Sequence, residues 1–512
     1  MRVDLHVHSK YSEKPSQWIL KKIDCPESFT EPLRLYDIAR QRGMTHVTIT
    51  DHNRITGALE IAHLPGTFIS EEVTAHFPDD GCKVHVLALD ITESQHHEIQ
   101  KIRKNIYQLA SYLRQENIFH MVAHPLYAVN EKITLSHFEK LLLLFQNFEL
   151  NGARNSRENN TLVKIVRGLS PQHIEQLANQ HDLAPLYPEP HRKGLFGGSD
   201  DHSSLNIART YTEFLGDFGT KVSLSAESEY TVEVHSTPPV PQTMAHNLYG
   251  IAWQFFRDKY GLGRFSNKDA LVRFLDKSFG LECASSPKIL YKVYSFINIQ
   301  KQKRLHFPVT DSLASLLRYE TYKILNETPE LLRTANDDSC KIQSREQRWF
   351  EFVNQLSNRV IVHHGNHLLD QLSGANIFNI FNTVGSAAGL YSLLAPYFIA
   401  FSQFTMGRDL GCEIARSFAQ NQSETGSATE ECSVAHFTDT LYEVNGVALT
   451  LRQQVRCAAA ANRSYTLITC DDQNRVAAGN VKHFKPIGTC NLPEYGQQKL
   501  FYPPLLEMID YT

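Results

Sequence analysis

Asp4-Leu5-His6-Val7-His8-Ser9 is the stretch that decides the fold of this chain. Its apolar residues predict a strand, and alternation along a strand places the imidazoles of His6 and His8 on the same face. Two imidazoles that converge on one point form the beginning of a metal site. Such a pair alone is a weak signal, because surface strands carry it by chance. The stretches that follow strengthen it.

Five further stretches place metal-ligand side chains beside predicted strands. They are Thr50-Asp51-His52, Ser70-Glu71-Glu72, Val84-His85, His124-Pro125 and Gly198-Ser199-Asp200-Asp201-His202. Strands are predicted at 2–5, 46–50, 67–70, 84–89, 119–123 and 148–150. Amphipathic helices alternate with them, as at 100–114, which predicts an α/β fold with parallel strands. The ends of parallel barrel strands meet at one cavity, so these side chains are expected to converge.

The ordered motifs DLHVHS, ITDHN, SEEVT, VHVLAL, AHP, ELN and GSDDH resemble the polymerase and histidinol phosphatase (PHP) family of metal-dependent phosphoesterases. The likeness spans residues 1 to about 210 and implies a distorted (β/α)7 barrel that holds two or three divalent metal ions. Carried over position by position, the implied ligands are His6, His8, Glu13, His52, Glu72, His85, His124, Asp200 and His202. The expected catalytic residues among them are His6, His8, His52, Asp200 and His202.

Three of these positions leave an alternative open. Many relatives carry Asp or His where this chain has Glu13, and the longer side chain would shift the third metal or leave a dinuclear site. Glu71 and Glu72 lie on opposite faces if both are in the strand, and the match of Glu72-Val-Thr to the family pattern favours Glu72. The one-residue gap to the last histidine favours Asp200 over Asp201, which is then a supporting residue.

A cluster of this kind suits hydrolysis of a phosphomonoester or phosphodiester by a metal-activated hydroxide. Paired cations about 3.5–4 Å apart activate a water and stabilise charge on the attacking and leaving oxygens. Mixed nitrogen and carboxylate ligands favour zinc, manganese or iron. Asp4, Asp51, Glu149 and Asn151 are candidates to orient the ligands, with ordinary structural hydrogen bonding as the alternative.

Recognition of a small phosphorylated substrate requires cationic donors near the metals. Arg154 and Arg157 follow the predicted strand 148–150 at the expected end of the barrel, and Arg192 and Lys193 are further candidates. The alternative for each is a solvated surface charge. The identity of the substrate does not follow from the sequence.

The remainder of the chain divides at the proline-rich stretch STPPVP, residues 236–241. We predict the phosphoesterase domain at 1–235, an all-α domain at 242–418 and a polar linker at 419–433. His363, His364 and His367 fall in the all-α part, where they are expected on a helix surface, because they lack carboxylates at helical spacing.

Residues 434–512 resemble the beginning of a group 1 retaining glycosyltransferase, with a strand, a glycine loop and a helix of a Rossmann-like domain. Asn445 and Gly446 correspond to the loop that approaches the sugar donor and acceptor in that family. The resemblance implies a PHP–glycosyltransferase fusion with a truncated transferase part. Its activity would then require a separate glycosyltransferase chain as partner. The alternative is a non-catalytic scaffold of sugar-transfer machinery.

The composition of the 512-residue chain limits its class. Apolar residues at 42% and charged residues at 21% are typical of globular proteins, and a net charge of −4 gives no signal for nucleic acid or an anionic membrane. Nine scattered cysteines without a CxxC pair favour a reducing cytoplasm over a disulfide framework. The charge-free run 371–407 is a weak membrane signal, for which a buried helical hairpin is expected.

Overall fold

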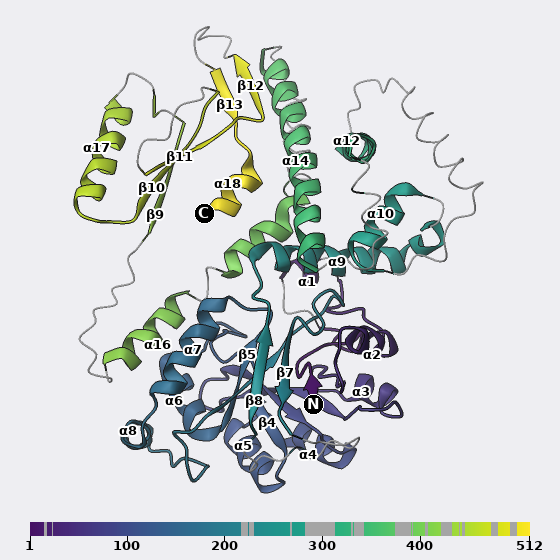
Figure 1. Ribbon diagram of the computed structural model, residues 1–512, viewed down its shortest axis with the longest axis vertical. Helices are drawn as coiled ribbons and strands as arrows, with labels where there is room; N and C mark the ends of the chain where they lie inside the picture. The colour runs from purple at the N-terminus through teal and green to yellow at the C-terminus, as the bar shows by residue number, and fades with distance from the viewer. Residues whose placement is uncertain are drawn as a thin grey trace. The chain divides into compact units, whose positions relative to one another are not determined.

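The computed structural model describes residues 1–14, 18–22, 24–216, 224, 230–266, 269–281, 313–328, 331, 342–373, 391, 393–404, 408–420, 433–439, 441–442, 446–472, 480–491 and 499–512. The chain is a mixed α/β protein (Figure 1). It forms two compact units. The first comprises Met1–Ser266, Leu275–Glu282 and Ser402–Glu424, and the second comprises Asn267–Phe274, Cys283–Phe401 and Thr425–Thr512.

The first unit alternates strands with helices over most of its length. Its strands are β1 (Arg2–Val3), β2 (Ser70–His76), β3 (Lys83–Leu89), β4 (Phe119–Val122), β5 (Asn147–Asn151), β6 (Gly194–Gly198), β7 (Thr210–Phe214) and β8 (Val232–Ser236). Its helices are α1 (Trp18–Lys22), α2 (Pro32–Gln41), α3 (Thr56–Ile61), α4 (Glu93–Ile102), α5 (Ile106–Gln115), α6 (Leu135–Leu144), α7 (Ser156–Gly168), α8 (Pro171–His181), α9 (Pro241–Lys259), the short 3-10 helix η1 (Leu262–Phe265) and α16 (Arg408–Gln420). The helix α10 (Ala270–Ser278) contributes residues to both units.

The main sheet has the order β2-β3-β4-β5-β6. β4, β5 and β6 are parallel, whereas β3 is antiparallel to both of its neighbours. The expectation that all strands are parallel is therefore wrong for β3. Residues 77–82 connect β2 to β3, and a parallel crossover needs a dozen or more residues, so this short connection can only reverse the chain. A second sheet, β1-β7-β8, is antiparallel.

The first segment of the chain links both ends of the main sheet. On one side the backbone N–H of Thr50 donates to the carbonyl of Val7 at 2.9 Å, and on the other the N–H of Asp200 donates to the carbonyl of His6 at 2.7 Å. The segment around Thr50 in turn bridges in parallel to the start of β2. Backbone pairing therefore runs in a ring, and its finer assignment to a (β/α)7 barrel stays a prediction.

The strands of this ring are buried on both faces. Along β3, Val84, Val86 and Ala88 pack in the cluster that contains the helices α5 and α6. Leu87 and Leu89 pack in a separate cluster with residues of β1, β4 and β6. Alternation thus gives each strand an outer face toward helices and an inner face toward the ring.

Two helices predicted for the all-α domain belong to the first unit instead. α16 packs on α6 and α7, and the ring of Phe418 lies 5.9 Å from that of Phe138 and 5.0 Å from that of His173. α9 is attached to the loop after β6, because the amide of Gln254 donates to the carbonyl of Ser203 at 3.1 Å. Burial of their apolar faces against the ring explains why composition alone misplaced them.

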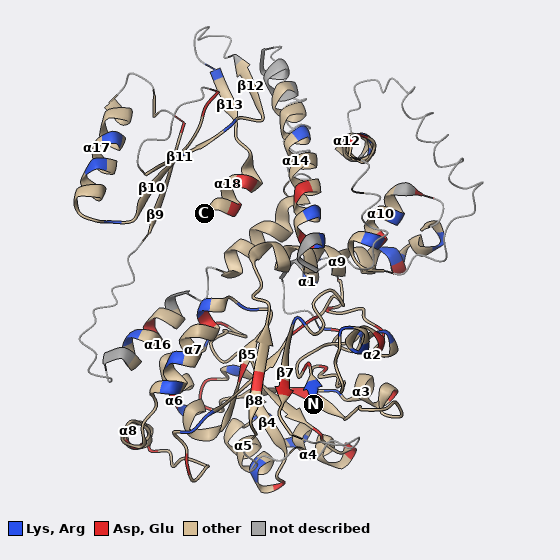
Figure 2. Ribbon diagram, viewed as in Figure 1, with Lys and Arg blue, Asp and Glu red and all other residues tan. Residues whose placement is uncertain are grey.

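Charge on the outer helices is mixed in sign. Figure 2 shows Lys and Arg together with Asp and Glu on both α2 and α7. The mixture agrees with the small net charge of the sequence.

The second unit contains the helices α12 (Leu313–Glu327), α14 (Ile342–Ser373), α17 (Gly446–Ala460) and α18 (Leu505–Tyr511) and the strands β9 (Val434–Thr438), β10 (Tyr465–Cys470), β11 (Val481–Phe484), β12 (Gly488–Asn491) and β13 (Lys499–Tyr502). β9, β10 and β11 are parallel, and α17 connects β9 to β10. Gly446 begins α17, while Asn445 lies outside the described residues. The Rossmann-like arrangement stays a prediction.

Two further expectations concern the membrane and the cysteines. Among the described residues, no helix combines the length and the apolar character needed to cross a bilayer. Residues 374–390 of the charge-free run lie outside the described part of the chain. Among the described cysteines, Cys25, Cys82, Cys457 and Cys470 are free.

Candidate metal centre

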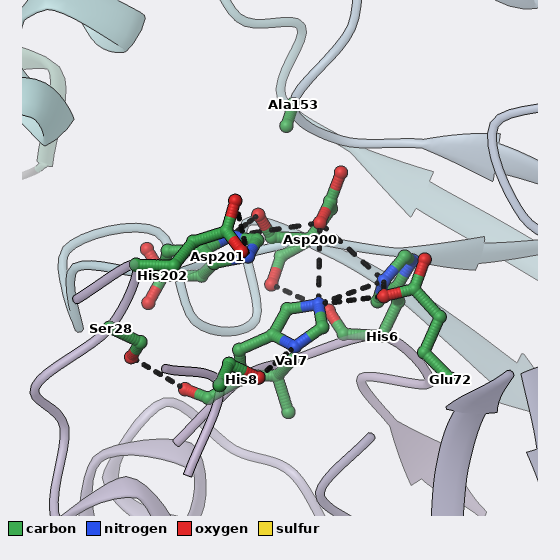
Figure 3. Close-up of polar contacts among 12 residues, drawn as sticks. His6, Val7, His8, Ser28, Glu72, Ala153, Asp200, Asp201 and His202 are labelled. Carbon is green, nitrogen blue, oxygen red and sulfur yellow. Dashed lines mark hydrogen bonds and ion pairs between the residues drawn. The ribbon is translucent and has the colours of Figure 1, made fainter. Parts of the chain in front are cut away.

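Eight predicted ligand side chains meet in one cluster inside the ring of the first unit. They are His6, His8, His52, Glu72, His85, His124, Asp200 and His202. All but His124 belong to three overlapping groups whose nitrogen and oxygen atoms are close enough to share an ion. His124 contacts His85 and Glu72 of these groups. Figure 3 shows the two histidines of the first segment between Glu72 on one side and Asp200 and His202 on the other. The direction of β3 explains how His85 arrives, because an antiparallel strand begins at the edge where its parallel neighbours end.

The orientation of His6 is fixed by a buried carboxylate. Its Nδ1 lies 2.8 Å from Oε1 of Glu149, and since a carboxylate only accepts, Nδ1 carries the proton. The other oxygen of Glu149 accepts from the backbone N–H of His124 at 2.8 Å and from the amide of Asn151 at 2.9 Å. The same amide donates to Asp200 at 3.1 Å. In the neutral ring, Nε2 of His6 therefore bears a lone pair directed into the cluster.

A second chain of hydrogen bonds orients His8. The hydroxyl of Ser12 donates its only proton to Asp51 at 2.9 Å, so it accepts from Nδ1 of His8, which is also 2.9 Å away. Asp51 is held in turn by the backbone N–H and the hydroxyl of Ser9, at 2.8 and 2.6 Å. The neutral His8 ring thus also directs a lone pair from Nε2 into the cluster.

The two lone pairs face each other. Nε2 of His6 and Nε2 of His8 are 3.1 Å apart, which in the neutral rings described above brings two acceptors together without a proton between them. Around them, the buried atoms Nδ1 of His52, Oε2 of Glu72 and Nε2 of His202 make no hydrogen bond among the described residues. Nitrogen and oxygen atoms that are buried and converge on one point are what a divalent cation requires, so the residues present fit metal ions of the kind that the sequence predicts.

Glu72 is the central carboxylate of the cluster. Its Oε2 lies 3.3 Å from His6, 3.2 Å from His8 and 2.9 Å from His52, and its Oε1 lies 2.6 Å from His85. With histidine rings beside both of its oxygens, Glu72 would help to hold metal ions in this cluster.

Glu71 points to the opposite face of β2, as alternation requires. It accepts from Nδ1 of His96 at 2.9 Å and from the amide of Gln100 at 2.7 Å, both on α4. Of the two candidate glutamates, the structure brings only Glu72 into the cluster.

The loop after β6 separates the roles of its two aspartates. Oδ1 of Asp200 lies 3.5 Å from His6 and 3.6 Å from His8, and the residue has a left-handed φ of 51°. Asp201 turns away and accepts from the backbone N–H groups of Ser204 and Asn206 at 2.6 and 2.9 Å. Asp201 therefore fixes the loop that presents Asp200.

Asp4 ties the same loop to the first strand. It accepts from the backbone N–H of Ser199 at 2.8 Å and from that of Ala208 at 2.7 Å. Burial raises the pKa of Asp4 to about 6, although these hydrogen bonds act in the opposite direction.

Electrostatics in the cluster reflect the contact between buried carboxylates and histidines. Burial lowers the pKa of His6, but Glu149, Asp200 and Glu72 outweigh burial and hold that pKa well above its ordinary value. The pKa of His52 is raised well above its ordinary value in the same way, by Glu72 and Glu27. The carboxylate pKa values of Glu72 and Asp200 are conversely held well below normal by the histidines, against the effect of burial. The carboxylates thus demand positive charge, as protons or as cations.

Of the predicted phosphate-binding residues, only Arg154 lies beside the cluster. Its guanidinium is 3.7 Å from Asp200 and stacks on the ring of Tyr127 at 3.5 Å. Arg157 is exposed on α7. Arg192 is exposed and paired with Glu189 at 3.3 Å, at the end of β6 opposite to Asp200, and Lys193 donates to the carbonyls that end α6. A position two residues before a strand cannot reach the edge at which that strand ends.

The structure does not bring Glu13 to the cluster. Its side chain is 54% exposed and pairs with Arg54 at 3.2 Å. A residue that the sequence analysis missed, Glu27, lies there instead, with Oε2 3.4 Å from His52 and Oε1 4.0 Å from His202. Glu27 is 5% exposed. A buried position for a glutamate in an irregular segment leaves no periodic signal, so only the fold reveals it.

The fold and the cluster together define a mixed α/β protein with a buried histidine–carboxylate site. No family model matches the chain. A stretch of 73 residues, 14% of this chain, is 41% identical to the uncharacterized protein MJ1587 of Methanocaldococcus jannaschii, and the match spans 41% of that protein.

Solved structures similar to the chain include PsfC from Pseudomonas syringae, with 15% identity and a TM-score of 0.29 over 51% of this chain and 98% of PsfC. They also include a Bifidobacterium adolescentis protein named "putative metal-dependent phosphoesterase", with 15% identity and a TM-score of 0.22 over 40% of this chain and 88% of that chain.

Proposed function

We propose that the first unit hydrolyses a phosphoester, either a phosphomonoester or a phosphodiester of a small molecule, with two or three divalent ions of zinc, manganese or iron. The observation that carries the proposal is the approach of Nε2 of His6 to Nε2 of His8 at 3.1 Å, with each ring oriented by its other nitrogen. When bound, such ions activate water and stabilise charge on phosphate oxygens. The ligands would be the eight clustered side chains.

The residues of the chain itself position the substrate and shape the site. Arg154 offers a guanidinium next to Asp200, where it would pair with a phosphate oxygen. Stacking on Tyr127 restricts the guanidinium to one plane, and Asn151 holds Glu149 and Asp200 in register with each other. Burial of His6, His8, Glu72 and Asp200 keeps bulk water away from these side chains.

A comparison of two adjacent glutamates tests this function. Protein loaded with Mn²⁺ or Zn²⁺ should hydrolyse an aryl phosphate, and Glu72→Gln should reduce kcat/KM by about 100-fold or more, since it removes a charge shared by several ligands. Glu71→Gln is the matched control, because the carboxylate of Glu71 bonds to His96 and Gln100 on the opposite face of β2, and it should retain most of the activity. Equal activity of wild type and Glu72→Gln would refute the proposal.

A second function is favoured by one observation in the other unit. The parallel strands β9 and β10 joined by α17 are a β-α-β unit, as in the start of a Rossmann-like domain. We propose that this part associates with a separate glycosyltransferase chain. The alternative is that it serves as a non-catalytic scaffold for sugar-transfer machinery. Co-purification of such a chain with the full-length protein is expected, and its consistent absence would remove this proposal.

We also propose a cytoplasmic location, which the nine scattered cysteines without a CxxC pair favour. Fractionation of cells that express the chain tests it.

A further inference from the structure

We propose that Glu27 completes a cation site with His52 and His202, in the place that the sequence analysis gave to Glu13. The inference deepens the proposed function and rests on its metal-dependent site. It concerns one ligand of one ion, so it can fail while the proposed function holds.

The first argument is the direction of the carboxylate. Glu27 presents its two oxygens to two different rings, Oε2 to Nε2 of His52 at 3.4 Å and Oε1 to Nε2 of His202 at 4.0 Å. The ligand atoms of His52 and His202 belong to a group with one from His8 in which all three lie within 4.8 Å of one another. The carboxylate therefore faces a set of three imidazoles.

The second argument is the state of the His202 ring. Its Nδ1 lies 3.1 Å from the backbone carbonyl of Asp200, and because a carbonyl only accepts, Nδ1 carries the proton. In the neutral ring Nε2 then bears a lone pair, and this buried atom has no hydrogen bond among the described residues. A lone pair that faces a carboxylate at 4.0 Å is an arrangement that a cation between the two would stabilise.

The third argument is that the segment of Glu27 is built against the first strand. The hydroxyl of Ser28 donates to the carbonyl of His8 at 3.3 Å (Figure 3), and the backbone N–H of Lys10 donates to the carbonyl of Thr30 at 2.9 Å. Glu27 directly precedes these two anchors in sequence and is almost fully buried. Burial of a carboxylate is costly unless a cation or hydrogen-bond donors compensate its charge.

The fourth argument is chemical. Three imidazoles and one carboxylate form a mixed nitrogen and oxygen set, which suits zinc, manganese or iron better than magnesium or calcium. Glu13 cannot serve this site as the side chains lie, because it is solvent-exposed and paired with Arg54.

The test compares the two glutamates in the full-length protein. Wild type, Glu27→Gln and Glu13→Gln are stripped with EDTA and titrated with Mn²⁺, and free Mn²⁺ is followed by electron paramagnetic resonance. We expect Glu27→Gln to bind one ion fewer than wild type, or to bind that ion about 10–100-fold more weakly. Glu13→Gln should match wild type in both number and affinity.

Thermal melts of the stripped proteins control for folding. Glu27→Gln removes a buried charge without changing shape, so its melting temperature without metal should be no lower than that of wild type, while the increase on addition of Mn²⁺ should be smaller. If the glutamine variant melts early, Glu27→Asp provides the second measurement, with a weakened rather than lost ion expected from its shorter reach.

Equal Mn²⁺ number and affinity in wild type and Glu27→Gln would overturn the inference, as would loss of an ion in Glu13→Gln. Loss of the ion in Glu27→Gln without hydrolysis of any phosphoester by wild type would support the inference and refute the proposed function. Hydrolysis by wild type with unchanged ion binding in Glu27→Gln would support the proposed function and overturn the inference.

Discussion

At the scale of single residues, the site depends on side chains that hold other side chains in place. Glu149 fixes His6, and the pair of Ser12 and Asp51 fixes His8. Each partner leaves one ring nitrogen for an ion, which is how a protein selects the tautomer of a ligand histidine. The proposed chemistry therefore depends on residues that touch neither metal nor substrate.

Arg154 gives the first prediction at this scale. Arg154→Met should raise KM for a phosphate ester by about 10–100-fold with a smaller change in kcat, because a charged hydrogen bond to substrate contributes about 1.5–3 kcal/mol. Steady-state kinetics of the metal-loaded protein measure both constants. Arg192→Met is the matched control, since Arg192 lies at the other end of β6, and an equal effect of the two variants would contradict the assignment.

The raised pKa values of His6 and His52 give a second prediction. In the absence of cations, nearby carboxylates hold protons on these rings against the effect of burial, so an entering ion must displace protons at neutral pH. Cation binding should strengthen as pH rises and weaken as pH falls, by up to about tenfold per pH unit for each proton released. The carboxylates of Glu72 and Asp200 stay ionised near neutral pH, because their pKa values are lowered, and add no dependence there. Mn²⁺ affinities that do not change between about pH 6 and 8 would contradict the displacement of protons from His6 and His52 by the ion.

Sequence motifs predicted most of the clustered residues but not their supporting shell. His6 and His8 could be predicted because period-two alternation is a local rule. The same rule places Glu71 and Glu72 on opposite faces, and the resemblance of Glu72-Val-Thr to the family pattern favoured Glu72. Glu27 could not be predicted from the sequence, because no motif or periodicity near it indicates that it approaches His52 and His202 after folding.

At the scale of elements, close contact between β6 and the first segment creates the site. Gly198 ends β6, and a Cβ added there would lie 2.7 Å from the backbone nitrogen of His6 and 3.0 Å from Oε1 of Glu149. No side chain fits between these two strands at this point. The loop that carries Asp200 starts from this contact.

Gly198→Ala is therefore expected to displace the first segment. We expect it to destabilise the first unit by about 1–3 kcal/mol or more and to weaken Mn²⁺ binding, because a backbone atom must move. Gly411→Ala is the control, since a Cβ there meets no atom within 4 Å and lies inside the helix α16. That change should raise stability by about 1 kcal/mol. Chemical denaturation and Mn²⁺ titration distinguish the two, and tolerance of Gly198→Ala would refute the account.

Local signals specified helix and strand content better than strand direction. The helix predicted at 100–114 is found as the end of α4 and nearly all of α5, with a break at 103–105. The reversal of β3 was missed because an apolar run has the same composition in either direction, and only the short connection at 77–82 determines it.

At the scale of the whole molecule, the clustered histidines and carboxylates all belong to the first unit. Bound cations stabilise only the state that contains the assembled site, by about 2.7 kcal/mol when the ion is at 100 times its dissociation constant. The effect should be confined to the unit that provides the ligands.

Hydrogen exchange followed by mass spectrometry tests this confinement. Addition of Mn²⁺ to stripped protein should slow exchange in peptides from β2 to β6, and exchange in peptides from β9 to β13 should not change. Equal protection of both regions would contradict a site built from the first unit alone. EDTA should reverse the protection.

The sequence by itself determined which residue types gather and in what order, because alternation, helical periodicity and motif spacing are local properties of the chain. It predicted eight of the nine side chains that the structure brings to the cluster when Glu27 is counted among them. Tertiary structure alone decided that Glu27 and not Glu13 faces His52, that β3 is reversed, and that α9 and α16 pack on the ring. These outcomes depend on contacts between residues far apart in the chain, for which no local pattern of side chains exists.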